Sequence, residues 1–162
     1  RANALGMKVI YNDINRLSPE MEQRYQVEYT QRNDLIKESD YISLHVPHTP
    51  ENDKMIGREQ FAMMKPTAYL INTCRGGVVD EEALIEALAD DQIAGAGLDV
   101  FSEEPLPSSS PLWKMPNVLI SPHVAGISPR YLERAAELFA ENLKRYAGGL
   151  PLLNQYETER GY

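Results

Sequence analysis

Residues 68–90 read AYLINTCRGGVVDEEALIEALAD, and this stretch decides the fold. Its first five residues form a mainly apolar run, which is typical of a buried strand. The spacing predicts a helix over residues 80–90, because Asp80 can cap its first turn and two glutamates then favour the positive end of the helix dipole. Arg75 and two glycines connect the strand to the helix. A strand followed closely by a helix is the repeating unit of α/β proteins.

The same alternation of strand and helix runs along most of the chain. Further strands are predicted at residues 7–12, 41–45, 94–100 and 117–121, and further helices at 31–39 and 58–64. A last, long helix is predicted to start with Ser128 as N-cap and Pro129 at its first position, and to end at Gly148 and Gly149. We expect its apolar stripe to pack against the sheet. The pattern predicts a doubly wound, Rossmann-type parallel sheet with function at the carboxyl ends of its strands.

Composition excludes several classes of function. The chain has 162 residues and a formal net charge of −8, which argues against nucleic-acid and anionic-membrane partners. No apolar run is long enough to span a membrane, so we expect no membrane partner. With one cysteine the chain cannot form an internal disulfide, and a cytoplasmic location is the simplest expectation. Because no CxxC or HExxH pattern occurs, we expect no metal site.

Asp13 closes the first predicted strand and has two interpretations. A dinucleotide-binding fold places an acidic residue there to accept hydrogen bonds from the adenosine ribose hydroxyls. Such a carboxylate would repel the 2′-phosphate of NADP and so favour NAD. The alternative is a solvated turn aspartate, which the local sequence NDIN also favours.

Two cationic or titratable side chains follow predicted strands further along the chain. Arg75 precedes two glycines, which could let a ligand approach the backbone closely, and arginine binds carboxylates through two hydrogen bonds. The alternative is an arginine exposed on a loop. His123, in the sequence ISPHVAG, is the side chain best suited to proton exchange near neutral pH. His45 and His48 are interpreted as structural histidines, and neither is assigned to catalysis.

A carboxylate hydrogen-bonded to His123 would hold its tautomer and favour its protonated form. The loop sequence LDVFSEEPLP offers two adjacent candidates, Glu103 and Glu104. Spacing alone does not choose between them.

Taken together, these motifs resemble the D-isomer-specific 2-hydroxyacid dehydrogenase family. The resemblance covers nearly the whole chain. Its most specific stretches keep the order and spacing of the family and are SLHVPHTPEN (43–52), MMKPTAYLINTCRGGVVDEEALIEAL (63–88), AGAGLDVFSEEPLP (94–107) and NVLISPHVAG (117–126).

The resemblance implies roles for individual residues. Arg75 of the RGG motif corresponds to the catalytic arginine, and His123 corresponds to the general acid/base. Glu104, the last acidic residue before the proline, corresponds to the family glutamate and is selected over Glu103. The cofactor implied is NAD, with contacts from Asp13, Val46, Pro47, Cys74, Asp99, His123 and Gly126. The implied reaction is hydride transfer between NAD(H) and a D-2-hydroxy acid or 2-keto acid, and we expect a homodimer.

The chain also departs from the family. The glycine loop G-x-G-x-x-G does not occur in it, and we expect the first Rossmann strand and the N-terminal substrate domain to be absent too. The Rossmann fold is therefore predicted to be incomplete, with strand edges left unpaired. Residues 1–150 are expected to form the partial NAD-binding domain, and residues 151–162 a segment returning toward the missing domain. Two alternatives remain at this point, an NAD(H)-sensing corepressor-like protein of the same fold and an inactive fragment.

Overall fold

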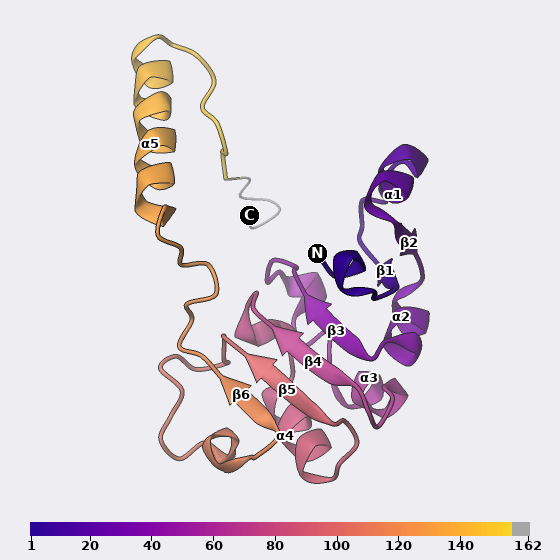
Figure 1. The fold of residues 1–162 in the computed structure, drawn as a ribbon. Helices are drawn as coiled ribbons and strands as arrows, with labels where there is room; N and C mark the ends of the chain where they lie inside the picture. Colours follow the sequence, from indigo (N-terminus) through magenta and orange to yellow (C-terminus); the bar gives the residue numbers. More distant parts are fainter. Residues whose placement is uncertain (157–162) are drawn as a thin grey trace.

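The computed structural model describes residues 1–156 and has an α/β architecture (Figure 1). Short helices and strands alternate along the chain. The strands are β1 (Val9–Tyr11), β2 (Val27–Tyr29), β3 (Tyr41–Leu44), β4 (Tyr69–Asn72), β5 (Gly95–Leu98) and β6 (Val118–Ile120). The α-helices are α1 (Pro19–Tyr25), α2 (Arg32–Glu38), α3 (Arg58–Met63), α4 (Glu81–Ala89) and α5 (Tyr131–Ala147).

The strands pair in parallel but form two separate sheets. The larger sheet has the order β3-β4-β5-β6, and β1 pairs only with β2. Parallel pairing confirms the predicted Rossmann-type fold, because parallel neighbours need the crossover helices that the sequence indicated. No ladder joins β1 to β3 in the described part of the chain. Strand edges are therefore left unpaired within the described residues, as the sequence predicted.

Helices α2, α3 and α4 pack in series and cover one face of the larger sheet (Figure 1). Successive residues of a strand therefore alternate between the face that the helices cover and the face that they leave open. Ile42, Leu70 and Ala96 are buried on the helix side, whereas Leu119 of the edge strand is 71% exposed on the other side. Helix α4 begins as predicted, with the Asp80 side chain accepting a hydrogen bond from the backbone of Ala83.

Helix α5 contradicts two predictions. It starts at Tyr131 rather than directly after Ser128, because residues 128–130 form a turn in which the carbonyl of Ser128 accepts from the backbone of Tyr131. The helix also stands clear of the sheet, and none of its residues is buried (Figure 1). An amphipathic stripe predicts a helix, but it does not identify the surface that the stripe will meet.

The sequence did not predict α1 and β2. Helix α1 begins at Pro19 with Ser18 as its N-cap, and β2 follows the helix closely. The segment is short and polar, so hydrophobic periodicity gave little signal. Of the predicted C-terminal segment, residues 157–162 lie outside the described residues.

Candidate active site

The predicted site residues follow the carboxyl ends of the parallel strands. Asp13 comes after β1, residues 45–47 after β3, Arg75 after β4, Asp99 after β5 and His123 after β6. This edge of a parallel sheet is where α/β proteins bind ligands. The arrangement matches the one that the sequence predicted.

The structure brings His123 and Glu104 into direct contact. Nδ1 of His123 lies 2.7 Å from Oε2 of Glu104, and Oε1 of Glu104 accepts a hydrogen bond of 3.0 Å from the backbone N–H of Phe101. Both side chains are partly exposed, so the pair can be reached from outside. Of the two adjacent glutamates, Glu104 therefore pairs with the imidazole, as the resemblance implied.

The ionisation of Glu104 suits this pairing. The hydrogen bond from His123 lowers the pKa of Glu104, the backbone N–H of Phe101 lowers it further, and partial burial opposes both. Glu104 is therefore a carboxylate at neutral pH and accepts a hydrogen bond from Nδ1–H of His123. We infer this tautomer from the hydrogen bond, and it leaves Nε2 of His123 to exchange a proton with a ligand.

Asp99 holds the turn that carries His123. Its carboxylate accepts hydrogen bonds from the hydroxyl of Ser121 and from the backbone N–H groups of Val124 (2.9 Å) and Ala125 (2.8 Å). Its carbonyl accepts from the backbone N–H of His123, at 2.9 Å. Burial alone would raise the pKa of Asp99, but these hydrogen bonds outweigh it and the pKa lies below its ordinary value. A direct contact of this buried side chain with the cofactor stays a prediction.

His123 itself has a left-handed backbone conformation, with φ of 54°. Residues with a side chain adopt this region infrequently, and it often marks functional positions. Here it turns the chain so that the backbone bonds to Asp99 while the ring meets Glu104.

The backbone of Arg75 is held by a buried residue, Asn72, that was not predicted from the sequence. Asn72, at the end of β4, is 1% exposed, and its side chain donates to the carbonyl of Arg75 (3.0 Å) and accepts from the backbone of Cys74 (3.1 Å). Nη1 of Arg75 donates to the carbonyl of Cys74 at 2.6 Å. A polar residue closing an apolar strand was the available signal, because a buried amide needs partners.

The two glycines after Arg75 accommodate protein groups. A Cβ on Gly76 would overlap the carbonyl of Phe101, and a Cβ on Gly77 would lie 2.5 Å from Cε1 of the His48 ring. Gly76 therefore lets the loop that carries Glu104 pack against the loop that carries Arg75. We expected these glycines to allow the close approach of a ligand, but the structure places other segments of the chain against them instead.

An open cavity of about 690 Å³ surrounds Arg75. Its lining comprises His45, Val46, Pro47, His48, Cys74, Arg75 and Tyr156. Within the described residues, His123 and Glu104 do not line it, so the structure brings Arg75 together with Val46, Pro47 and Cys74 but not directly with the His123–Glu104 pair. Among residues 1–156, the groups that line it are cationic, polar or apolar and include no carboxylate, which fits an anionic ligand such as a dinucleotide or a 2-keto acid.

Two predicted cofactor residues, Asp13 and Gly126, are exposed and do not line this cavity. Asp13 is exposed, and its Oδ1 accepts from the backbone N–H of Asn15 at 2.8 Å, which is the turn geometry considered as its alternative role. Gly126 is exposed, with open space where a Cβ would lie. Their contacts with a cofactor stay predictions.

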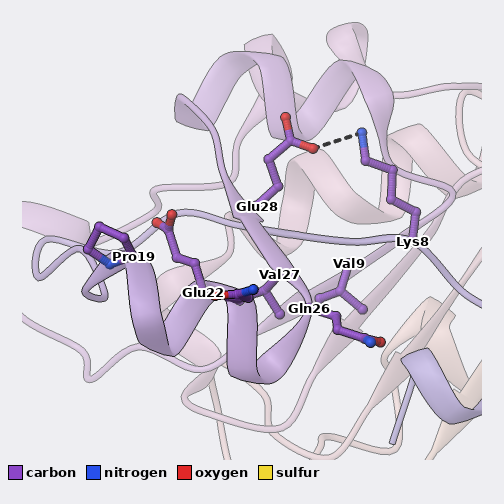
Figure 2. A pocket seen from close by; sticks show the side chains of 8 residues that line it. Lys8, Val9, Pro19, Glu22, Gln26, Val27 and Glu28 are labelled. Atoms are coloured by element: carbon purple, nitrogen blue, oxygen red, sulfur yellow. Dashed lines mark ion pairs between the residues drawn. The ribbon is translucent and has the colours of Figure 1, made fainter.

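A second cavity, of about 470 Å³, lies over β1, α1 and β2 (Figure 2). Figure 2 shows Lys8 and Glu28 paired beside it, at a distance of 3.1 Å. None of the residues predicted for the site lines it. Across residues 1–156, no cluster of three or more His, Cys, Asp or Glu side chains could hold a metal ion. No helix in the same residues is both long enough and apolar enough to cross a membrane.

Known proteins share both the sequence and the fold. The sequence profile of the NAD binding domain of the D-isomer specific 2-hydroxyacid dehydrogenases matches residues 1–125. A glyoxylate reductase of Korarchaeum cryptofilum is 48% identical over 92% of the chain, and one of Thermococcus litoralis is 50% identical over the same share. The matched regions cover 45% and 44% of those relatives, so the chain spans a little under half their length.

Solved structures of D-2-hydroxyacid dehydrogenases have the same fold as the chain. The holo form of D-mandelate dehydrogenase from Rhodotorula graminis matches 94% of the chain and 44% of its own, with a TM-score of 0.88 and 33% identity. D-lactate dehydrogenase with NAD⁺ from Lactobacillus jensenii also matches 94% of the chain and covers 50% of its own, with a TM-score of 0.82 and 33% identity. The chain therefore belongs to the D-isomer specific 2-hydroxyacid dehydrogenase family, of which it carries NAD binding domain sequence.

Proposed function

We propose that this chain provides the NAD-binding part and the proton-transfer pair of a D-2-hydroxyacid dehydrogenase. The observation that carries the proposal is the hydrogen bond of 2.7 Å between His123 and Glu104, at the edge of the sheet where Arg75 also lies. A carboxylate that orients an imidazole is an arrangement suited to general acid/base catalysis.

Each residue has a separate task in this reaction. The guanidinium of Arg75 binds the carboxylate and the C2 oxygen of the substrate, because its planar donors match two oxygens at once. His123 donates a proton from Nε2 to the C2 oxygen when a 2-keto acid is reduced, and takes it back in the reverse direction. Glu104 stabilises the protonated ring and holds its orientation. NAD(H), when bound, supplies or accepts the hydride.

The cofactor would lie along the carboxyl ends of the strands. Asp13 would hold the ribose hydroxyls with Oδ2, since Oδ1 already accepts from Asn15. Its negative charge would favour NAD over NADP. Val46, Pro47, Cys74 and Gly126 would contact the cofactor, and Asp99 would fix the turn after β6.

The substrate proposed is a small D-2-hydroxy acid or the corresponding 2-keto acid. The names of the two archaeal relatives, both glyoxylate reductases, support a small 2-keto acid. We also propose a homodimer in the cytoplasm. The single cysteine, which forms no disulfide, fits a reducing compartment.

Steady-state turnover of the full-length protein tests this function. NADH oxidation would be followed with glyoxylate, hydroxypyruvate and pyruvate, and the His123→Ala variant would serve as the control. We expect turnover with at least one acid and its loss in the variant. Tight NADH binding without turnover of any acid would contradict the proposal and favour the NAD(H)-sensing alternative.

A further inference from the structure

Glu81, the first residue of α4, is a charged side chain to which the reaction proposed above gives no task. Its Oε2 accepts a hydrogen bond of 3.0 Å from the backbone N–H of Ser102, which lies 21 residues further along the chain. Ser102 belongs to the loop after β5, and the same loop carries Glu104. The contact therefore reaches from the helix that follows the Arg75 loop to the loop of the proton-transfer pair.

The peptide unit between Phe101 and Ser102 is held from two sides. Its N–H, on Ser102, is donated to Glu81. Its carbonyl, on Phe101, lies directly against Gly76, where a Cβ would overlap it. The side chain of Phe101 is buried, which limits how far its own backbone can move. The loop after β5 is thereby tied to the segment that begins directly after Arg75.

The next N–H group toward the N-terminus of this loop orients Glu104. The backbone N–H of Phe101 donates to Oε1 of Glu104 at 3.0 Å, and Oε2 of Glu104 lies 2.7 Å from Nδ1 of His123. Two consecutive N–H groups are therefore donated to two different carboxylates, that of Glu104 and that of Glu81. A displacement of this stretch of backbone would move the donor that sets Glu104 against the imidazole.

The negative charges beside the His123 ring come from other residues. Glu104 contacts the ring directly, and the buried carboxylate of Asp99 accepts from the backbone N–H of Val124, the residue after His123. Within residues 1–156, Glu81 is not among the groups that contact the ring. A change at Glu81 should therefore reach His123 through the position of Glu104.

We propose that Glu81 is a positioning residue for proton transfer, which holds the loop after β5 through Ser102 so that Glu104 meets His123. The inference rests on the proposed function, because it assumes that His123 exchanges the proton of the substrate. It also provides a physical link between the Arg75 loop and the His123–Glu104 pair.

The test measures the pH profile of kcat/KM in the full-length protein. The substrate is whichever of glyoxylate, hydroxypyruvate and pyruvate the wild-type protein reduces fastest. Glu81→Ala removes the acceptor, so kcat should fall by about three- to tenfold, the effect of one lost hydrogen bond. The alkaline limb should move to lower pH, because a displaced Glu104 stabilises protonated His123 less. The dissociation constant for NADH should stay unchanged.

Two further variants separate the reach of the Glu81 side chain from its charge. Glu81→Gln keeps an oxygen acceptor at the same reach and should restore the wild-type profile. Glu81→Asp keeps the negative charge at the start of α4 but is one methylene shorter, so it should behave like Glu81→Ala. Because it retains that favourable charge, it also keeps the inference testable if Glu81→Ala does not fold.

Glu82→Ala is the matched control. Glu82 is the exposed neighbour in the same first turn of α4, so its loss removes the same charge from the helix. It should leave the pH profile in place. An equal shift in Glu82→Ala would overturn the inference, because the charge of the helix start alone would then explain the effect.

A double variant tests whether Glu81 acts through Glu104. In the Glu104→Gln background, Glu81→Ala should produce no additional shift of the alkaline limb. An additional shift there, or an unchanged limb in the folded Glu81→Ala and Glu81→Asp variants, would overturn the inference. If the wild-type protein reduced none of the acids, or if Glu104→Gln itself left the limb in place, the proposed function would fail instead.

Discussion

The four-stranded and two-stranded sheets differ in how firmly they hold the residues at their edges. Among residues 1–156, every fully buried residue lies between Ile36 and Leu112, in the part built around β3 to β6. Strands β1 and β2 contain no buried residue at all. The smaller sheet is therefore stabilised mainly by local contacts, such as the hydrogen bond between Tyr11 and Glu22.

Two aspartates that follow strands differ in the same way, because one is buried in the larger sheet and the other is exposed beside the smaller one. Asp99 is 3% exposed, and its carboxylate has three hydrogen-bond donors from the turn after β6. Asp13 is exposed, and its carboxylate accepts a hydrogen bond from the nearby backbone N–H of Asn15. The proposed proton transfer thus depends on the well-packed sheet, while the proposed choice of nucleotide depends on the loosely packed one. Changes in the two regions should affect different properties.

The largest effect is expected at the edge of the four-stranded sheet. His123→Ala should lower kcat for 2-keto acid reduction by about 10²–10⁴-fold, the usual size of general acid/base catalysis. The dissociation constant for NADH, measured by fluorescence titration, should change much less. A kcat within tenfold of wild type would show that another group carries the proton.

The next effect concerns packing and compares the two sheets directly. Phe61, on α3, is 1% exposed, so Phe61→Ala should lower the free energy of unfolding by about 3–5 kcal/mol. Val9→Ala in β1, where the side chain is half-buried, should lower it by only about 1 kcal/mol. Urea denaturation of both variants in the full-length protein measures the difference. Equal losses would mean that the two sheets are packed alike.

A matched pair of glutamates sharpens the comparison within the catalytic loop. Glu104 stays ionised well into acid because its pKa is lowered, so its negative charge is present throughout the neutral range. Glu104→Gln removes the charge that favours protonated His123. The alkaline limb of kcat/KM for keto-acid reduction should therefore move to lower pH. Glu103→Gln should leave the profile in place, and a shift in that variant alone would reverse the assignment.

The smallest effect is expected on the two-stranded sheet. Asp13→Ala should reduce the preference for NADH over NADPH by about tenfold, because it removes a negative charge that opposes the additional phosphate. Both values of kcat/KM would be measured with the same 2-keto acid. Unchanged discrimination would mean that Asp13 only stabilises its own turn.

The larger sheet could be predicted from the sequence, and the reasons are local. Apolar runs identified β3 to β6, and Asp80 identified the start of α4, because each signal depends on neighbouring residues alone. The placement of Arg75, Glu104 and His123 along one edge of the sheet followed from parallel topology. The pairing of Glu104 needed the family resemblance, since spacing left Glu103 open.

Other features could not be predicted because they depend on partners distant in sequence. Asn72 carries no motif, and its role appears only where its amide meets the backbone of the Arg75 loop. The apolar stripe of α5 predicted a helix, but it did not predict that the helix would stand away from the sheet. The capping signal of Ser18 before Pro19 was present and could have identified α1.

The left-handed backbone of His123 also determines which substitutions the position tolerates. At a φ of 54° a β-branched residue would add strain to the loss of the imidazole, whereas asparagine adopts this region more readily than most residues. His123→Asn should therefore abolish proton transfer while keeping the turn intact. Histidine and asparagine codons differ by a single base, so a folded form without proton transfer is within reach of one point mutation.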